Sequence, residues 1–179
     1  MAQPRIGQKV VVDVPATTAN LGPGFDCLGA ALDLNNRFAM RRIEGGGERF
    51  ELIIEGTEGS HLRGGPENLV YRAAQRVWKA AGLEPVALEA RVRLAVPPAR
   101  GLGSSATAIV AGLMGANALV GEPLSKEKLL ELAIDIEGHP DDPLFKLALE
   151  ELGFYAVDVR FLGCYPMHPR RREAKKEYS

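Results

Sequence analysis

The chain has 179 residues, a net charge of −1 and 46% apolar residues. This length suits one domain, or one domain and part of another, and it is sufficient for a buried core. The near-neutral charge gives no electrostatic basis for binding nucleic acid or an anionic membrane, and the apolar content excludes a disordered chain. Two cysteines, Cys27 and Cys164, cannot form a disulfide framework, which favours a reducing compartment.

Neither a secretion signal nor a membrane span is predicted. The first nine residues lack the apolar segment of a secretory signal. The most apolar stretch, residues 106–120, is interrupted by Asn117 and is shorter than the ~20 residues that cross a bilayer. We therefore expect a cytoplasmic protein.

Strand signals dominate the first part of the chain. Residues 9–14 are rich in β-branched side chains and stop at Pro15, and the polar, glycine-rich residues 17–24 predict a loop. Residues 37–43 and 50–54 are further strand candidates, and three glycines between them predict a hairpin turn.

Helical periodicity follows, with one more strand. Apolar residues at helical spacing predict a helix over 68–81 that stops at a glycine. The alternation of charged and apolar residues over 88–96 predicts a strand with one face in water, of the antiparallel kind. Two helices are then expected, over 104–120 and 125–133.

The turn at residues 101–106, Gly-Leu-Gly-Ser-Ser-Ala, carries the strongest chemical signal, and we call it the Gly–Ser turn. It joins a strand to a helix, and the first N–H groups of a helix lack partners and carry partial positive charge. Such a helix start suits a phosphate group. Gly101 and Gly103 let the backbone approach the oxygens, while Ser104 and Ser105 add hydroxyls that can cap the helix, bind phosphate or reach magnesium. An ordinary serine-capped helix is the alternative.

Two common phosphate-binding patterns do not fit this turn. The Walker pattern requires Gly-Lys-Ser/Thr, and there is no lysine here. The dinucleotide pattern is satisfied, with Ala106 as its last small residue and Glu122 as an acidic partner. A dinucleotide fold, however, needs a preceding strand buried on both faces, whereas Arg91 and Arg93 give this strand a wet face. We therefore reject a dinucleotide fold.

Three motifs, in order along the chain, resemble those of the GHMP kinases. Residues 97–106, Pro-Pro-Ala-Arg followed by the Gly–Ser turn, look like the second signature motif of that family. Residues 15–29 are similar to the homoserine kinase branch, as is Glu-Gly-His-Pro-Asp at 137–141. The resemblance covers roughly residues 1–141. It implies an α+β fold like the N-terminal domain of these kinases, with a mixed or antiparallel sheet, helices on one side and a truncated second domain.

The resemblance also implies an enzyme, a kinase that transfers phosphate from ATP to the side-chain hydroxyl of L-homoserine, on the path to threonine. Mg²⁺ is the implied cofactor, held by Ser105 and Glu137. Asn20, Asp26 and His139 are the implied contacts to homoserine. The residues assigned to ATP are Pro97, Pro98, Ala99, Arg100, Gly101, Leu102, Gly103, Ser104, Ser105, Ala106, Thr107 and, near the adenine, Asn68.

After residue 141 the chain departs from the kinase pattern. Asp142 takes the catalytic position at which these kinases have asparagine, and it adds negative charge near the phosphates. Residues 134–166 resemble the C-terminal end of a prephenate dehydratase ACT domain, which suggests a chimera or a truncation. We therefore expect a kinase N-terminal domain over 1–141, an ACT-like helix and strand within 142–166 and a disordered basic tail over 167–179.

The predicted protein is thus a cytoplasmic member of the homoserine kinase branch. Its expected partners are L-homoserine and ATP, without nucleic acid or membrane, and a homodimer is left open. The alternative is a non-catalytic fragment, or a protein that binds an amino acid or nucleotide and has an ACT-like C-terminus. The truncated second domain and Asp142 favour that alternative, and homoserine-dependent release of ADP separates the two.

Overall fold

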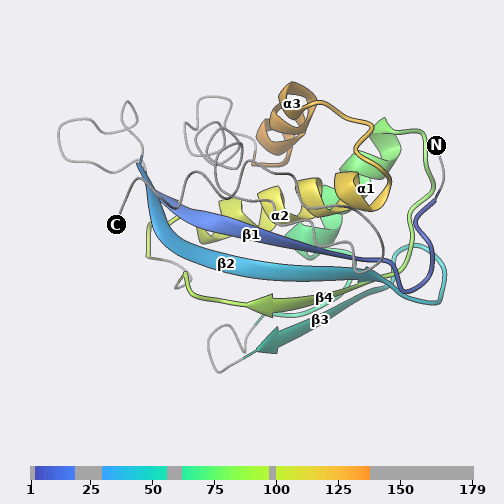
Figure 1. The fold of residues 1–179 in the computed structure, drawn as a ribbon, viewed down its shortest axis with the longest axis horizontal. Coiled ribbons are helices and arrows are strands. Elements are labelled where there is room, and N and C mark those ends of the chain that lie inside the picture. The colour runs from blue at the N-terminus through green and yellow to red at the C-terminus, as the bar shows by residue number, and fades with distance from the viewer. Residues whose placement is uncertain (1–2, 19–29, 56–61, 97–99, 138–179) are drawn as a thin grey trace, which may run out of the picture.

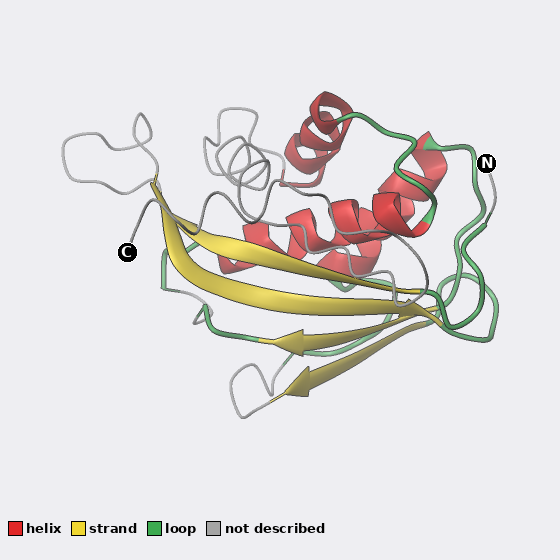
Figure 2. Ribbon diagram, in the orientation of Figure 1, coloured by secondary structure: helices red, strands yellow, loops and turns green. Residues whose placement is uncertain are grey.

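The computed structural model describes residues 3–18, 30–55, 62–96 and 100–137. Four strands in these ranges form one sheet, in the order β1-β2-β4-β3. Three helices cover one face of that sheet (Figures 1 and 2), which confirms the predicted α+β class with helices on one side. The elements are β1 (Lys9–Thr18), β2 (Ala30–Arg42), β3 (Phe50–Glu55), α1 (Leu69–Ala80), β4 (Leu88–Arg93), α2 (Ser104–Leu119) and α3 (Lys126–Glu137).

The sheet is mixed. β2 pairs antiparallel with β1 and with β4, whereas β3 pairs parallel with β4. The predicted hairpin across residues 45–47 is therefore wrong, because β4 lies between β2 and β3. The chain passes from β3 through α1 to β4, the crossover that joins parallel neighbours. Gly47 instead allows its own backbone to lie close to that of Pro85, since a Cβ there would lie 2.9 Å from the carbonyl oxygen of Pro85.

The first two strands are longer than predicted. β1 continues past Pro15 to Thr18, so the expectations that the strand stops at Pro15 and that a loop begins at residue 17 are wrong. β1 is an edge strand, where a residue without an N–H is tolerated. The pairing register shifts between Pro15 and Ala16, which marks a bulge. β2 begins at Ala30, seven residues before the predicted start at Arg37.

The helices follow their sequence signals closely. α1 begins after Asn68 and ends before Gly82, which has a φ of +69°. α2 ends before Gly121, with a φ of +87°. Glycine adopts such angles without the Cβ penalty of other residues, and it therefore stops both helices. α3 runs four residues beyond the predicted end, to Glu137.

The core lies between the helices and the sheet, and α2 occupies its centre. α2 packs against α1 on one side and against β1 on the other. Two glycines allow this close packing. A Cβ at Gly112 would lie 2.3 Å from the Val70 carbonyl oxygen, and one at Gly115 would lie 2.3 Å from the Met40 sulfur. The position of α2 fixes its first turn at the end of the domain where β4 leaves the sheet (Figure 1).

None of the helices in the described part of the chain has the length and apolar character needed to cross a lipid bilayer. Several predicted features lie outside the described residues. These are the rest of the loop after β1, the helix within 142–166, the strand that follows it, the basic tail and both cysteines.

Candidate functional site

A cavity of about 720 Å³ lies where β4 leaves the sheet and α2 begins. Its volume is within the range of roughly 300 to 1,000 Å³ that is usual for ligand pockets. Most of the predicted ATP residues that the structure describes line it. Those from the segment that starts α2 are Arg100, Gly101, Gly103, Ser104, Ser105 and Thr107. The structure therefore brings the Gly–Ser turn onto a space large enough for a ligand.

One wall of the cavity is apolar and comes from the face of the sheet that the helices cover. Phe38 of β2, Leu52 and Ile54 of β3 and Val92 of β4 contribute to it. These side chains stand on three neighbouring strands, in the order β2-β4-β3. An apolar wall of this kind suits a planar base, while the polar groups of the Gly–Ser turn form another part of the same lining.

The start of α2 has the features that an anion site requires. Gly103 precedes the helix with a φ of 65° and a ψ of 30°, and no side chain of the described residues caps the helix there. The first intrahelical bond runs from the Thr107 N–H to the Gly103 carbonyl, at 2.9 Å. The earlier N–H groups of the first turn lack an intrahelical partner, and the helix dipole places partial positive charge on them.

The packing of the fold requires glycine at position 103, whether or not a ligand is bound. A Cβ at this position would lie 2.5 Å from the hydroxyl oxygen of Thr17 and 3.1 Å from its carbonyl oxygen. Thr17 is fully buried, and its N–H donates to the Leu102 carbonyl at 3.3 Å. The end of β1 thus fixes the Gly–Ser turn from one side, a contact that the sequence pattern did not predict.

Asn68, predicted to lie near the adenine, lines the same cavity, and its side chain caps α1. Its Oδ1 accepts from the Val70 N–H at 3.0 Å, and its Nδ2 donates to the Arg63 carbonyl at 2.8 Å. The amide therefore orders the segment before α1. Contact between Asn68 and a base stays a prediction.

Asn36 is a cavity residue that the sequence interpretation missed. It is fully buried, and its amide bonds to Thr107 of α2. A signal was present, because Asn36, Phe38 and Met40 alternate along β2 and all three face the core. A polar residue in such a row needs a buried partner.

The predicted magnesium and substrate residues are only partly described. Ser105 is exposed and lines the cavity, whereas Glu137 is the half-buried last residue of α3 and is not part of the lining. Among the described residues, no group of three or more His, Cys, Asp or Glu side chains is placed to hold a metal ion. Residues outside the described ranges are Asn20, Asp26, Pro97, Pro98, Ala99, His139 and Asp142.

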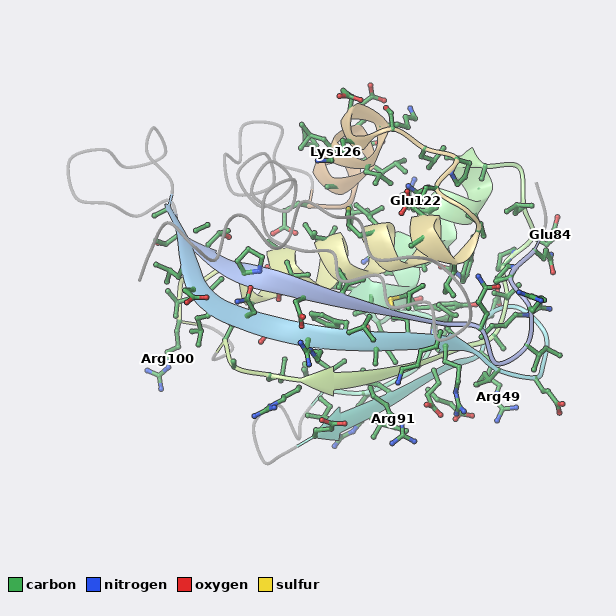
Figure 3. All side chains as sticks on the ribbon, in the orientation of Figure 1. Arg49, Glu84, Arg91, Arg100, Glu122 and Lys126 are labelled. Carbon is green, nitrogen blue, oxygen red and sulfur yellow. The ribbon has the colours of Figure 1, made fainter. Side chains whose placement is uncertain are left out.

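Charged side chains gather on the other face of the sheet, where Arg91 points away from the helices (Figure 3). Glu89 bonds there to Arg41 at 2.7 Å and to Arg91 at 3.1 Å. Burial alone would raise the pKa of the Glu89 carboxyl, but the hydrogen bonds and charges of these arginines outweigh burial and lower that pKa. This ion-pair group stabilises the sheet and lies apart from the cavity.

Comparison with known proteins shows which class of fold this chain has. Residues 68–148 match the sequence model of the GHMP kinases N terminal domain. The crystal structure of homoserine kinase from Cytophaga hutchinsonii superposes with a TM-score of 0.68 and 28% identity, over 83% of this chain and 48% of that one. Residues 68–148 are therefore similar to the N-terminal domain of the GHMP kinases, and the chain has a fold like that domain.

The chain is also similar to homoserine kinases from Synechococcus strains. It is 99% identical to the homoserine kinase of Synechococcus sp. strain CC9605 over 142 residues, and 97% identical to that of strain CC9902 over the same length. These residues are 79% of this chain and 45% of each relative. The chain thus spans about half the length of the curated relatives it matches.

A mevalonate kinase from Staphylococcus aureus shares the fold alone, with a TM-score of 0.58 and 19% identity over 80% of this chain and 50% of that one. The resemblance of residues 134–166 to an ACT domain is not borne out. The kinase family match continues to residue 148 and so includes the first part of that range.

Proposed function

We propose that this chain binds Mg·ATP in the cavity and serves an ATP-dependent kinase that phosphorylates the side-chain hydroxyl of L-homoserine. One observation carries the proposal: the uncapped start of α2 and the apolar wall of the sheet border one cavity. A nucleotide has an apolar base at one end and phosphates at the other, and this cavity offers a fitting surface to each.

The proposed reaction forms a bond from the homoserine hydroxyl oxygen to the γ-phosphorus of ATP. The bond from that phosphorus to the β–γ bridging oxygen breaks, ADP leaves and the hydroxyl proton is released. Such transfers depend mainly on positioning and charge stabilisation. The first-turn N–H groups of α2 and the hydroxyls of Ser104 and Ser105 would hold the phosphates, while the Gly–Ser turn keeps the backbone close to them.

Mg²⁺ would neutralise phosphate charge, with Ser105 and Glu137 as its proposed protein ligands. The hydroxyl of Ser105 fits this role because Ser105 is exposed on the cavity lining. Mg²⁺ usually takes one or two protein ligands and completes its shell with phosphate oxygens and water. It therefore does not require the cluster of acidic side chains that a protein-only metal site would need.

The proposed acceptor site comes from the resemblance alone. Asn20, Asp26 and His139 would contact homoserine, whose ammonium group suits a carboxylate such as Asp26. Asp142 would stand at the catalytic position that the homoserine kinases fill with asparagine. A cytoplasmic location, the boundary after residue 141 and a homodimer remain predictions of the same kind.

The first test is thermal unfolding of the full chain with and without Mg·ATP. Ligand at 100 times its dissociation constant stabilises a folded protein by about 2.7 kcal/mol, which corresponds to a rise in Tm of several degrees. ATP with a chelator and Mg²⁺ alone are the controls. A cooperative transition whose Tm does not respond to Mg·ATP would contradict nucleotide binding.

The second test is release of ADP with L-homoserine as acceptor. L-2-aminobutyrate, which lacks the terminal hydroxyl, is the matched control, because it keeps the ammonium and carboxylate groups. We expect release with homoserine alone and its loss in Ser105→Ala. Binding of Mg·ATP without homoserine-dependent release would favour the alternative of a non-catalytic nucleotide-binding protein.

A further inference from the structure

Asn36 lies where β2 and β4 stop pairing. The last paired residues at that end are Arg37 and Arg93. After Arg93 the chain continues toward the Gly–Ser turn. Asn36 is fully buried in the row of inward-facing side chains that includes Phe38 and Met40. An amide in such a row lowers stability unless its oxygen and nitrogen are hydrogen-bonded.

The oxygen and the nitrogen of the Asn36 side-chain amide both form hydrogen bonds. Its Oδ1 accepts from the N–H groups of Ala95 at 2.8 Å and Val96 at 2.9 Å. Its Nδ2 donates to the Thr107 hydroxyl at 2.9 Å, and that hydroxyl donates to the Ser104 carbonyl at 2.8 Å. One side chain therefore ties the segment that enters the Gly–Ser turn to the first turns of the helix that leaves it.

We propose that Asn36 is a positioning residue that braces the Gly–Ser turn through Thr107. The bracing holds the start of α2 at the cavity before any ligand arrives. A site held in this way loses less conformational entropy when it binds, so its affinity is higher. The effect on ATP affinity rests on the proposed function, whereas the bracing of the turn does not.

A second buried asparagine provides a matched control. The Nδ2 of Asn117 donates to the Leu124 carbonyl at 3.0 Å, and its Oδ1 accepts from the Leu124 N–H at 3.1 Å. Asn117 therefore ties down the loop after α2 by the same chemistry, and it does not line the cavity. Replacing either asparagine with alanine removes buried hydrogen bonds, and only one replacement frees the Gly–Ser turn.

Trypsin cleavage after Arg100 reports the order of the turn without a ligand, because Arg100 is exposed and projects outward where β4 gives way to α2 (Figure 3). We expect Asn36→Ala to speed cleavage at this bond about tenfold, the effect of losing about 1.4 kcal/mol of local stability. Asn117→Ala should lower Tm and leave this rate within about twofold of the parent rate. Equal acceleration in both variants would overturn the proposal.

Thr107 gives a test that does not depend on Asn36→Ala folding. Thr107→Val removes the bridging hydroxyl and keeps the side-chain shape, whereas Thr107→Ser keeps the hydroxyl. We expect Thr107→Val to speed cleavage after Arg100 and to weaken Mg·ATP binding, measured by calorimetry, about tenfold. In Thr107→Ser the cleavage rate and the Mg·ATP affinity should both stay close to the parent values. If the parent chain does not bind Mg·ATP, the proposed function is refuted. The cleavage rates would then still test whether Asn36 braces the Gly–Ser turn. Parent-like cleavage in Thr107→Val would refute the bracing.

Discussion

The two helices that border the cavity begin in different ways. Before α1, Asn68 has extended backbone angles, with a φ of −65° and a ψ of 134°, and its side chain accepts from the Val70 N–H. Before α2, Gly103 is in the left-handed region, and no described side chain caps the helix. Both residues line the same cavity.

This difference separates a structural helix start from a candidate functional one. The cap on α1 satisfies an N–H that would otherwise need water or a ligand, so α1 is stable without a bound molecule. α2 has no such cap, and packing against α1 and β1 stabilises it instead. The first N–H groups of α2 therefore stay available for an anion. The start of α2 also has two adjacent serines, Ser104 and Ser105, which the start of α1 lacks.

The largest expected effect comes from Gly103→Ala. The left-handed backbone costs about 1–2 kcal/mol for alanine, and the overlap with Thr17 adds about 1–3 kcal/mol. We expect the free energy of unfolding, measured with urea, to fall by about 2–5 kcal/mol, and Mg·ATP binding to be lost. Gly82→Ala is the control, because Gly82 has a similar φ of +69° and open space around it. Equal losses in the two variants would show that Thr17 does not constrain the turn.

Asn68→Ala should have a smaller effect. Loss of an N-cap lowers the free energy of unfolding by about 1 kcal/mol. Asn68→Asp retains an acceptor for the Val70 N–H and should keep most of that stability in urea unfolding. If Asn68→Asp unfolds as easily as Asn68→Ala, the bond from Nδ2 to the Arg63 carbonyl is the one that matters.

Glu89→Gln gives a change that involves neither helix start, since Glu89 lies on the opposite face of the sheet. Half-exposed Arg41 and Arg91 are its partners, so water screens the interaction and the loss at pH 7 should be about 0.5–1 kcal/mol. The pKa of Glu89 is lower in the folded chain than in the unfolded chain. Its stabilisation is therefore complete above the unfolded pKa of about 4.3 and disappears as the pH falls through the folded pKa.

The measurement for Glu89 is urea unfolding of parent and variant between pH 7 and pH 3. Glu51→Gln is the control, because the Glu51 side chain is 42% exposed and bonds to Arg49 on the surface. We expect its stability to stay close to the parent value at every pH. A difference between parent and Glu89→Gln that persists unchanged at low pH would contradict an electrostatic origin.

Ser105→Ala should change stability least, by less than about 0.5 kcal/mol, because Ser105 is exposed. Its effect should fall on Mg·ATP affinity. Ser125→Ala should show the opposite pattern, since Ser125 accepts from the Lys128 N–H at the start of α3. A marked loss of Tm in Ser105→Ala would show that this serine stabilises α2, as an ordinary cap does.

Local signals predicted the helices well and the strand pairing poorly. The glycines at 82 and 121 and the apolar spacing of α1 act within a few residues, so the sequence pattern contains them. The predicted hairpin failed because the position of β4 between β2 and β3 depends on how α1 packs across the sheet. The Gly–Ser turn and Asn68 were found from their motifs, whereas Asn36 was missed because its partners at 95, 96 and 107 are distant in the sequence.

The sequence by itself determined where α1 and α2 end and that a glycine- and serine-rich turn begins α2, because each depends on residue type and short-range spacing. Tertiary structure alone decided the strand order, the approach of Thr17 to Gly103 and the cavity shared by α1, α2 and the sheet. The physical reason is that close packing joins segments far apart in the chain, and the positions of those segments depend on every other element of the core.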